Sequence, residues 1–207
     1  LYKLEKTDGS LWIELNPVWL TYLKENYDIL SAFAYWGLTN FLQVRNPNVP
    51  NIPNKLVKRE ERNSLSNQHE FWNVVINQGM EVRCLYTSKH LEIRKYDLDH
   101  FIPWSFVSHD LLWNLMPSDP SINSSKSNKL PDLELYLPKL AEAHQEALRI
   151  YLKTGRQNKL LEDYLSLGYT VQDIVHMDKE HLLDCFFQTF TPMHQIALNM
   201  GFETWKY

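Results

Sequence analysis

The chain of 207 residues is long enough to bury a hydrophobic core in one large domain or two small ones. Apolar residues make up 44% of it and charged residues 22%, and its longest apolar runs fall far short of the roughly 20 residues that cross a bilayer. Its two cysteines, Cys84 and Cys185, are too few for a disulfide-stapled secreted scaffold, which favours a reducing, cytoplasmic setting. The composition therefore predicts a soluble globular protein with no membrane partner.

Charge is unevenly distributed along the chain. The net charge of −4 argues against a protein that coats nucleic acid by bulk charge. Residues 45–95 nevertheless carry nine Lys and Arg against five Glu, whereas residues 132–207 carry seven basic against eleven acidic side chains. Glu60 and Glu61 interrupt the positive part, so an unevenly charged, solvated loop is one interpretation of it. The other is contact with a nucleic-acid backbone, for which the candidates are Arg45, Lys55, Lys58, Arg59 and Arg62.

The first predicted elements are helical. Asn16-Pro17 is typical of a helix start, with Asn as the N-cap and Pro in the first turn. Aromatic and aliphatic residues at helical spacings from there to about Leu42 predict one or two core helices, broken near Gly37. The segment 45–55, rich in Pro and Asn, is expected to be irregular, and a further helix is predicted over 67–78.

Short extended segments are predicted next, followed by helices. Strands are expected over 81–87 and 95–103, and an extended piece over 113–117. Asp119-Pro120 repeats the helix-start pattern, and Pro131 is expected to end the helix that begins there. Later helices are expected over 138–155, over 158–168, and from Thr191-Pro192 to Gly201. The order predicts an α+β, mostly helical protein with three parts: an N-terminal helical region with a basic loop, a small strand-containing core and a C-terminal helical region, over 1–79, 80–131 and 132–207.

Polar side chains converge within the predicted core. Asp99 and His100 lie near the end of the second strand, and Asn114 lies in the extended piece that follows. Asn123 and Lys126 are three residues apart, so they share one face of the next helix. That helix consists largely of Ser and Asn, which are poor helix formers, so its composition indicates a functional site.

These residues suit the hydrolysis of a phosphodiester bond with one divalent metal. Asp99 and Asn123 offer the oxygen ligands that Mg²⁺ prefers, and Mn²⁺ would substitute for it. His100 can take a proton from the attacking water, and Lys126 can stabilise negative charge on the phosphate. Asn114 is expected to hold the imidazole by a hydrogen bond.

The core segment resembles the HNH endonucleases, the ββα-metal family. Its residue intervals and the sequence IPWSF after the histidine are most similar to the HNH domain of RNA-guided CRISPR effectors and of related stand-alone HNH proteins. The resemblance implies a small ββα-metal core flanked by helices and cleavage that leaves 5′-phosphate and 3′-hydroxyl ends. It also implies His100 as the general base, Asp99 and Asn123 as metal ligands, and Asn114 as a positioning residue. The resemblance extends to Lys126 as well.

One feature departs from the HNH sequence pattern, and another limits how Asp99 and His100 can form one site. Many HNH proteins support the hairpin with paired Cys-x-x-Cys motifs, whereas here Thr87 stands where a second cysteine would follow Cys84, so no structural zinc is expected. Adjacent strand residues point to opposite faces, so Asp99 and His100 share a site only where the strand twists or ends. Pro103 predicts such an ending.

The leading hypothesis is a Mg²⁺-dependent HNH endonuclease that cuts DNA in bacterial defence or mobile-element biology. Two alternatives stay open: a non-cutting, nucleic-acid-binding subunit of a larger defence complex, and an RNase or toxin-type nuclease. Because the chain begins with Leu1, an upstream region or a further protein chain is an additional expected partner.

Overall fold

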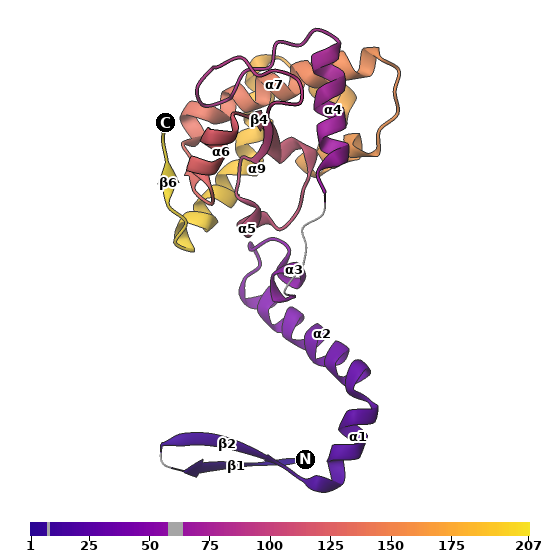
Figure 1. Ribbon diagram of the computed structural model, residues 1–207, viewed down its shortest axis with the longest axis vertical. Coiled ribbons are helices and arrows are strands. Elements are labelled where there is room, and N and C mark those ends of the chain that lie inside the picture. Colours follow the sequence, from indigo (N-terminus) through magenta and orange to yellow (C-terminus); the bar gives the residue numbers. More distant parts are fainter. Residues whose placement is uncertain (8, 58–63) are drawn as a thin grey trace. The chain divides into compact units, whose positions relative to one another are not determined.

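The computed structural model describes residues 1–7, 9–57 and 64–207 (Figure 1). The chain divides into two compact units, Leu1–Pro47 and Asn48–Tyr207. Helices dominate and the strands are short, which confirms the predicted α+β, mostly helical class. No helix in the described ranges has the length and hydropathy that a membrane span requires.

The first unit consists of a hairpin followed by helices. Strands β1 (Tyr2–Thr7) and β2 (Ser10–Leu15) pair antiparallel, and the helical part comprises η1 (Pro17–Trp19), α1 (Leu20–Glu25) and α2 (Tyr27–Arg45). The predicted helix start is confirmed, because Asn16 Oδ1 accepts a hydrogen bond from Val18 N at 3.1 Å.

Two predictions about this unit are wrong. The helices separate at Asn26, the residue between α1 and α2, and Gly37 lies inside α2, where nothing stands within 4 Å of the space that a Cβ would occupy. The apolar residues are not core either, since no residue of α1 or α2 is buried by the described residues and Phe33 and Trp36 are 68% and 60% exposed. Apolar spacing indicates which side chains favour burial, but it does not show what covers them.

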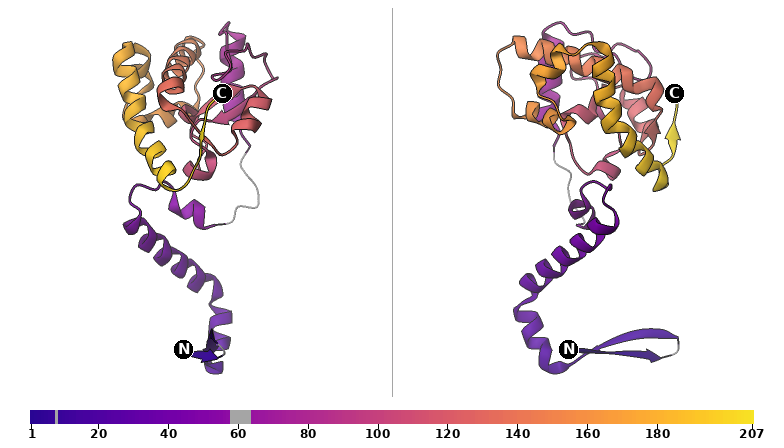
Figure 2. Two further views of the ribbon diagram at one scale, coloured as in Figure 1. Left: turned by 90° about the vertical axis from the view of Figure 1, so that its left-hand side faces the viewer. Right: turned by 180° about the vertical axis from the view of Figure 1, so that it is seen from behind.

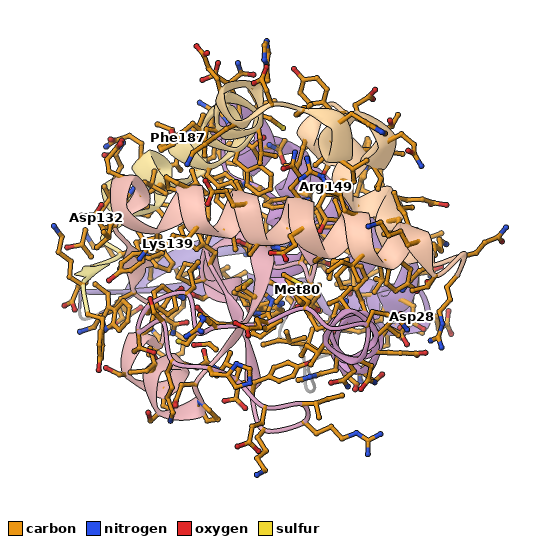
Figure 3. All side chains as sticks on the ribbon, turned by 90° about the horizontal axis from the view of Figure 1, so that it is seen from above. Asp28, Met80, Asp132, Lys139, Arg149 and Phe187 are labelled. Carbon is orange, nitrogen blue, oxygen red and sulfur yellow. The ribbon has the colours of Figure 1, made fainter. Side chains whose placement is uncertain are left out.

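The second unit holds all the other elements. Its first half comprises α3 (Ile52–Leu56), α4 (Ser66–Asn77), β3 (Asp97–His100), α5 (Trp104–Val107), η2 (Leu112–Asn114), β4 (Leu115–Ser118), α6 (Pro120–Lys126) and β5 (Leu130–Pro131). Its second half comprises α7 (Leu133–Lys153), η3 (Lys159–Leu167), α8 (Val171–His176), α9 (Lys179–Asn199) and β6 (Thr204–Trp205). Figure 3 shows α7 crossing the unit, with Asp132 at its start and Lys139 and Arg149 along its length.

Two small sheets connect distant parts of this unit. Strands β3 and β4 pair antiparallel, with Asp97 opposite Ser118 and His100 opposite Leu115. Strands β5 and β6 pair parallel, with Leu130 opposite Thr204, so the segment after α6 lies beside the last strand of the chain (Figure 2).

One hydrophobic core runs through the unit. Phe101, just after β3, packs edge-on against Phe190 of α9 at 5.4 Å between ring centroids. Tyr86 packs against Tyr136 of α7 and Trp205 of β6 at 5.0 and 4.9 Å. The strand hairpin is therefore held from outside by the C-terminal helices.

Several other element predictions need correction. Residues 81–87 form no strand and make only the isolated bridge between Arg83 and His90. The segment 45–55 is less irregular than expected, because α3 begins within it at Ile52. The predicted helix over 158–168 is a 3₁₀ helix, η3.

The two long C-terminal helices begin earlier than expected. Asp132 caps α7 by accepting a hydrogen bond from Leu135 N at 3.2 Å, and Pro138 lies inside the helix. Asp178 caps α9, which continues through Pro192, so no helix begins at Thr191. In both cases an Asp cap upstream of the proline satisfies the first amides, and packing outweighs the hydrogen bond that proline removes.

Candidate active site

Strands β3 and β4 and helix α6 form a compact ββα unit. Side chains two apart in β3 point to one face, so Asp97 and Asp99 share a face, and His100 is the last residue of the strand. Helix α6 packs on the aspartate face at two points. Asn123 Nδ2 donates to Asp97 Oδ2 at 3.3 Å, and Lys126 Nζ donates to Asp99 Oδ1 at 2.9 Å.

A cap at its first turn holds α6 in place despite its poor helix formers. Asp119 Oδ1 accepts hydrogen bonds from Ser121 N at 3.0 Å and Ser121 Oγ at 2.6 Å. Lys89 Nζ lies 2.7 Å from the other carboxylate oxygen. The hydrogen bonds from Lys89 and Ser121 lower the pKa of Asp119 to about 2, so the cap stays charged. The predicted helix start at Asp119-Pro120 is confirmed.

Asp99 has protein partners at both carboxylate oxygens. Tyr86 Oη donates to Oδ2 at 2.6 Å, and the Lys126 ammonium donates to Oδ1 and, at 2.7 Å, to the carbonyl of His100. Burial and the Asp99 carboxylate raise the pKa of Tyr86 well above its ordinary value, so its hydroxyl remains a donor. Lys126 is fully buried, so in this arrangement its ammonium joins α6 to β3 and does not present itself to a phosphate.

The imidazole of His100 contacts a residue that the sequence did not single out. Its Nε2 lies 2.9 Å from Oδ1 of Asp110, in the loop before η2. The contact with the imidazole was predicted for Asn114, but the Asn114 side chain bonds the backbone of Ile102: Oδ1 accepts from its N–H and Nδ2 donates to its carbonyl, each at 2.9 Å. Asn114 thus fixes the chain just after His100.

The oxygen atoms at this site can be compared with the ligands that a divalent metal ion needs. No group of three His, Cys, Asp or Glu side chains that could hold a metal occurs within the described residues. Mg²⁺ is usually bound through one or two carboxylates and several waters. Asp97 and Asn123 are in contact, only partly buried and rich in hard oxygen, which fits Mg²⁺. Asp99 fits the same set when Oδ1 gives up the Lys126 ammonium.

The predicted nucleic-acid contacts lie in different parts of the chain. Arg45 ends α2, with its guanidinium 3.5 Å from the ring centroid of Phe41. Lys55 in α3 donates to the carbonyl of Pro50 and lies 5.6 Å from the Phe106 ring centroid. Burial lowers the pKa of Lys55 to about 8. Lys58, Arg59 and Arg62 lie outside the described residues.

Sequence reasoning missed three residues of this site. Asp97 could have been found, because strand alternation places it on the face of Asp99. Tyr86 and Asp110 follow no periodic pattern, since each lies in an irregular segment outside the named helices and strands.

A comparison with known families covers this site. Residues 84–132 match a family model described as HNH endonuclease, and this segment includes β3, β4 and α6. No curated protein and no solved structure shows significant similarity to the chain. The match supports an HNH-family domain, as the resemblance in sequence suggested.

Proposed function

We propose that residues 84–132, which match a family model described as HNH endonuclease, are the catalytic part of a metal-dependent endonuclease that hydrolyses DNA phosphodiester bonds. The observation that carries the proposal is the ββα unit. It delivers His100 at the end of β3 and sets Asn123 of α6 against Asp97, so that a base and hard oxygen ligands come from one short segment.

Each residue has a proposed role. His100 accepts the proton of the attacking water as general base. Asp97 and Asn123 would hold Mg²⁺, for which Mn²⁺ would substitute, and Asp99 would join them on release of its Oδ1 by the Lys126 ammonium. The ion would supply positive charge beside the phosphate. Asn114 and Lys126 are positioning residues, because their side chains fix the backbone on either side of the base: Asn114 bonds Ile102 and Lys126 bonds the His100 carbonyl. The products carry 5′-phosphate and 3′-hydroxyl ends.

The basic residues are proposed to bind the phosphate backbone. Each contact with a phosphate adds affinity that salt removes, so DNA binding should weaken as the salt concentration rises. The candidates remain Arg45, Lys55, Lys58, Arg59 and Arg62. We place this activity in a reducing cytoplasm, in keeping with Cys84 and Cys185, whose thiols are free and buried.

Plasmid cleavage tests the proposal. Supercoiled DNA is incubated with wild type and with His100→Ala in Mg²⁺, in Mn²⁺ and in EDTA. Wild type should produce nicked or linear DNA only with metal, and loss of the general base should slow cleavage by roughly 10²–10⁴-fold. His181→Ala is the matched control, because His181 is an exposed histidine at the start of α9. This variant should cleave DNA as wild type does.

Other outcomes would favour other functions. If wild type binds DNA and cuts neither DNA nor RNA, the domain is a non-cutting subunit. If it cuts RNA with the same dependence on His100 and metal but leaves DNA intact, it is a ribonuclease. If His100→Ala cuts as fast as wild type, His100 is not the base.

A further inference from the structure

We infer that Asp110 is the positioning residue that fixes the tautomer of His100. The inference rests on the proposed function, because it concerns the base of that reaction. The Asp110 carboxylate holds Nε2–H of the imidazole, which leaves Nδ1 as the ring nitrogen with a lone pair for the proton of water.

The contact between the two side chains determines which nitrogen carries hydrogen. His100 Nε2 and Asp110 Oδ1 are 2.9 Å apart, with 8% and 17% of the two side chains exposed. An ionised carboxylate can only accept hydrogen bonds, so the shared proton belongs to Nε2. A neutral imidazole carries one ring hydrogen, so Nδ1 has none.

Contacts from two other elements fix the position of Asp110. Gln68 of α4 donates from Nε2 to the Asp110 carbonyl at 3.1 Å. Two residues later, Leu112 N donates to Asp163 Oδ2 of η3 at 2.7 Å, and Trp113 Nε1 donates to Ser166 Oγ at 2.8 Å. The loop is thereby tied to α4 on one side and to η3 on the other.

The histidine is fixed as firmly. Its carbonyl accepts the Lys126 ammonium, and Phe101 N donates to the carbonyl of Asn114 at 2.8 Å. The backbone on both sides of the contact between His100 and Asp110 is therefore held by hydrogen bonds to other elements. A second pair of this kind, His181 Nδ1 with Asp178 at 2.8 Å, has 75% and 65% of its side chains exposed and is open to water.

The experiment reads the tautomer directly. Long-range ¹H–¹⁵N spectra of ¹⁵N-labelled protein, recorded above the pH at which imidazoles carry charge and without added metal, report which nitrogen of His100 is protonated. The wild type should show the Nε2–H form. Asp110→Asn keeps the size of the side chain but presents an amide that can donate, so the population should move toward the Nδ1–H form.

Cleavage of plasmid DNA supplies the second measurement. In Mg²⁺, Asp110→Asn should slow cleavage by roughly 10²–10⁴-fold, the range expected when a base is held in the wrong tautomer. Asp178→Asn is the matched control, because it removes the carboxylate from the exposed pair while Asn still caps α9. This control should leave the His100 spectrum and the cleavage rate unchanged.

The results separate this inference from the proposed function. An Nδ1–H ring in wild type overturns the inference without any variant, and so does an Nε2–H ring that persists in Asp110→Asn. If wild type cuts no nucleic acid, the proposed function fails, and the ring tautomers of wild type and of Asp110→Asn together still decide whether Asp110 fixes the tautomer of His100. If wild type cuts and Asp110→Asn cuts equally fast, Asp110 does not serve the reaction.

Discussion

Lys126 shows how strongly single side chains determine the geometry of this site. Its ammonium is fully buried and bonds Asp99 and the His100 carbonyl, so it joins the last turn of α6 to the end of β3. Burying a charge is costly unless it is paired, and removal of one partner leaves the other charge unpaired. The position of α6 therefore depends on this pair more than on the helix propensity of its own residues.

Replacement of Lys126 by Met should destabilise the fold, because it leaves the Asp99 carboxylate buried without its ammonium. The free energy of unfolding should fall by about 3–5 kcal/mol in urea unfolding. The double variant Lys126→Met with Asp99→Asn should recover part of the loss. Lys179→Met, which breaks an exposed bridge to Glu142, is the control and should change little. Equal effects at both lysines would contradict this explanation.

His144 should make the protein sensitive to acid. It is fully buried, its Nδ1 lies 2.7 Å from Tyr164 Oη, and burial lowers its pKa to about 3. In the unfolded chain the ring protonates near pH ~6.5, so between that pH and about 3 only the unfolded state gains this proton. The contribution of His144 to the free energy of unfolding is complete above this window. It falls as the pH drops through the window, by about 1.4 kcal/mol per pH unit.

The contribution of His144 can be isolated by comparison. Urea unfolding from pH 7.5 down to 4 should show a shallower loss of stability in His144→Gln than in wild type, by about one proton. Glutamine retains a group that can bond the Tyr164 hydroxyl. Identical slopes would assign the acid sensitivity to other groups.

At the scale of elements, α6 illustrates a helix that depends on its cap. It is short and mostly Ser and Asn, so the first turn needs the Asp119 carboxylate, and Asp119 in turn is paired with Lys89 from the irregular segment before β3. Because Asn123 lies in this helix, loss of the cap should reach the proposed metal site.

Two substitutions of Asp119 should therefore differ. Asp119→Ala removes the acceptor of Ser121 N and should raise the Mg²⁺ concentration needed for plasmid cleavage by about 10-fold or more. Asp119→Asn keeps a good N-cap and should stay near wild type. Amide hydrogen exchange over α6 should rise in the alanine variant alone. If both variants need the same raised Mg²⁺ concentration, the charge of Asp119 matters more than its role as a cap. If both cleave as wild type does, the cap does not reach the proposed metal site.

Local chemistry explains which elements were predictable. Asn16 and Asp119 reveal helix starts because their side chains bond amides two residues on, and the strand before Pro103 follows from alternation and an ending at proline. Asp110 could not be found this way, because it lies in an irregular loop and only the fold of that loop brings it to His100. The break expected at Gly37 failed because glycine is tolerated inside a helix.

At the scale of the whole molecule, the domain matched to the family is only part of a folding unit. The aromatic side chains of residues 84–132 pack against partners on α7, α9 and β6. A segment of that length buries too little surface to fold alone. We therefore expect the C-terminal helices to be required for the fold of this segment.

Fragments should behave accordingly. A fragment of residues 48–207 should unfold cooperatively in urea, because it contains the complete second unit. A fragment of residues 84–132 should show no cooperative transition by circular dichroism. A folded, cooperative short fragment would mean that the hairpin and α6 need no support from α7 and α9.

The parallel pairing of β5 with β6 has a consequence for synthesis on the ribosome. Leu130 pairs with Thr204, so β5 must wait until the C-terminal helices have been made. At roughly 5–20 residues per second, translation of residues 133–207 lasts on the order of ten seconds after the last proposed site residue has been added. Throughout that interval the nascent chain carries the proposed catalytic side chains without the fold that aligns them. The proposed site can therefore reach its final arrangement only after Thr204 and Trp205 of β6 have been synthesised.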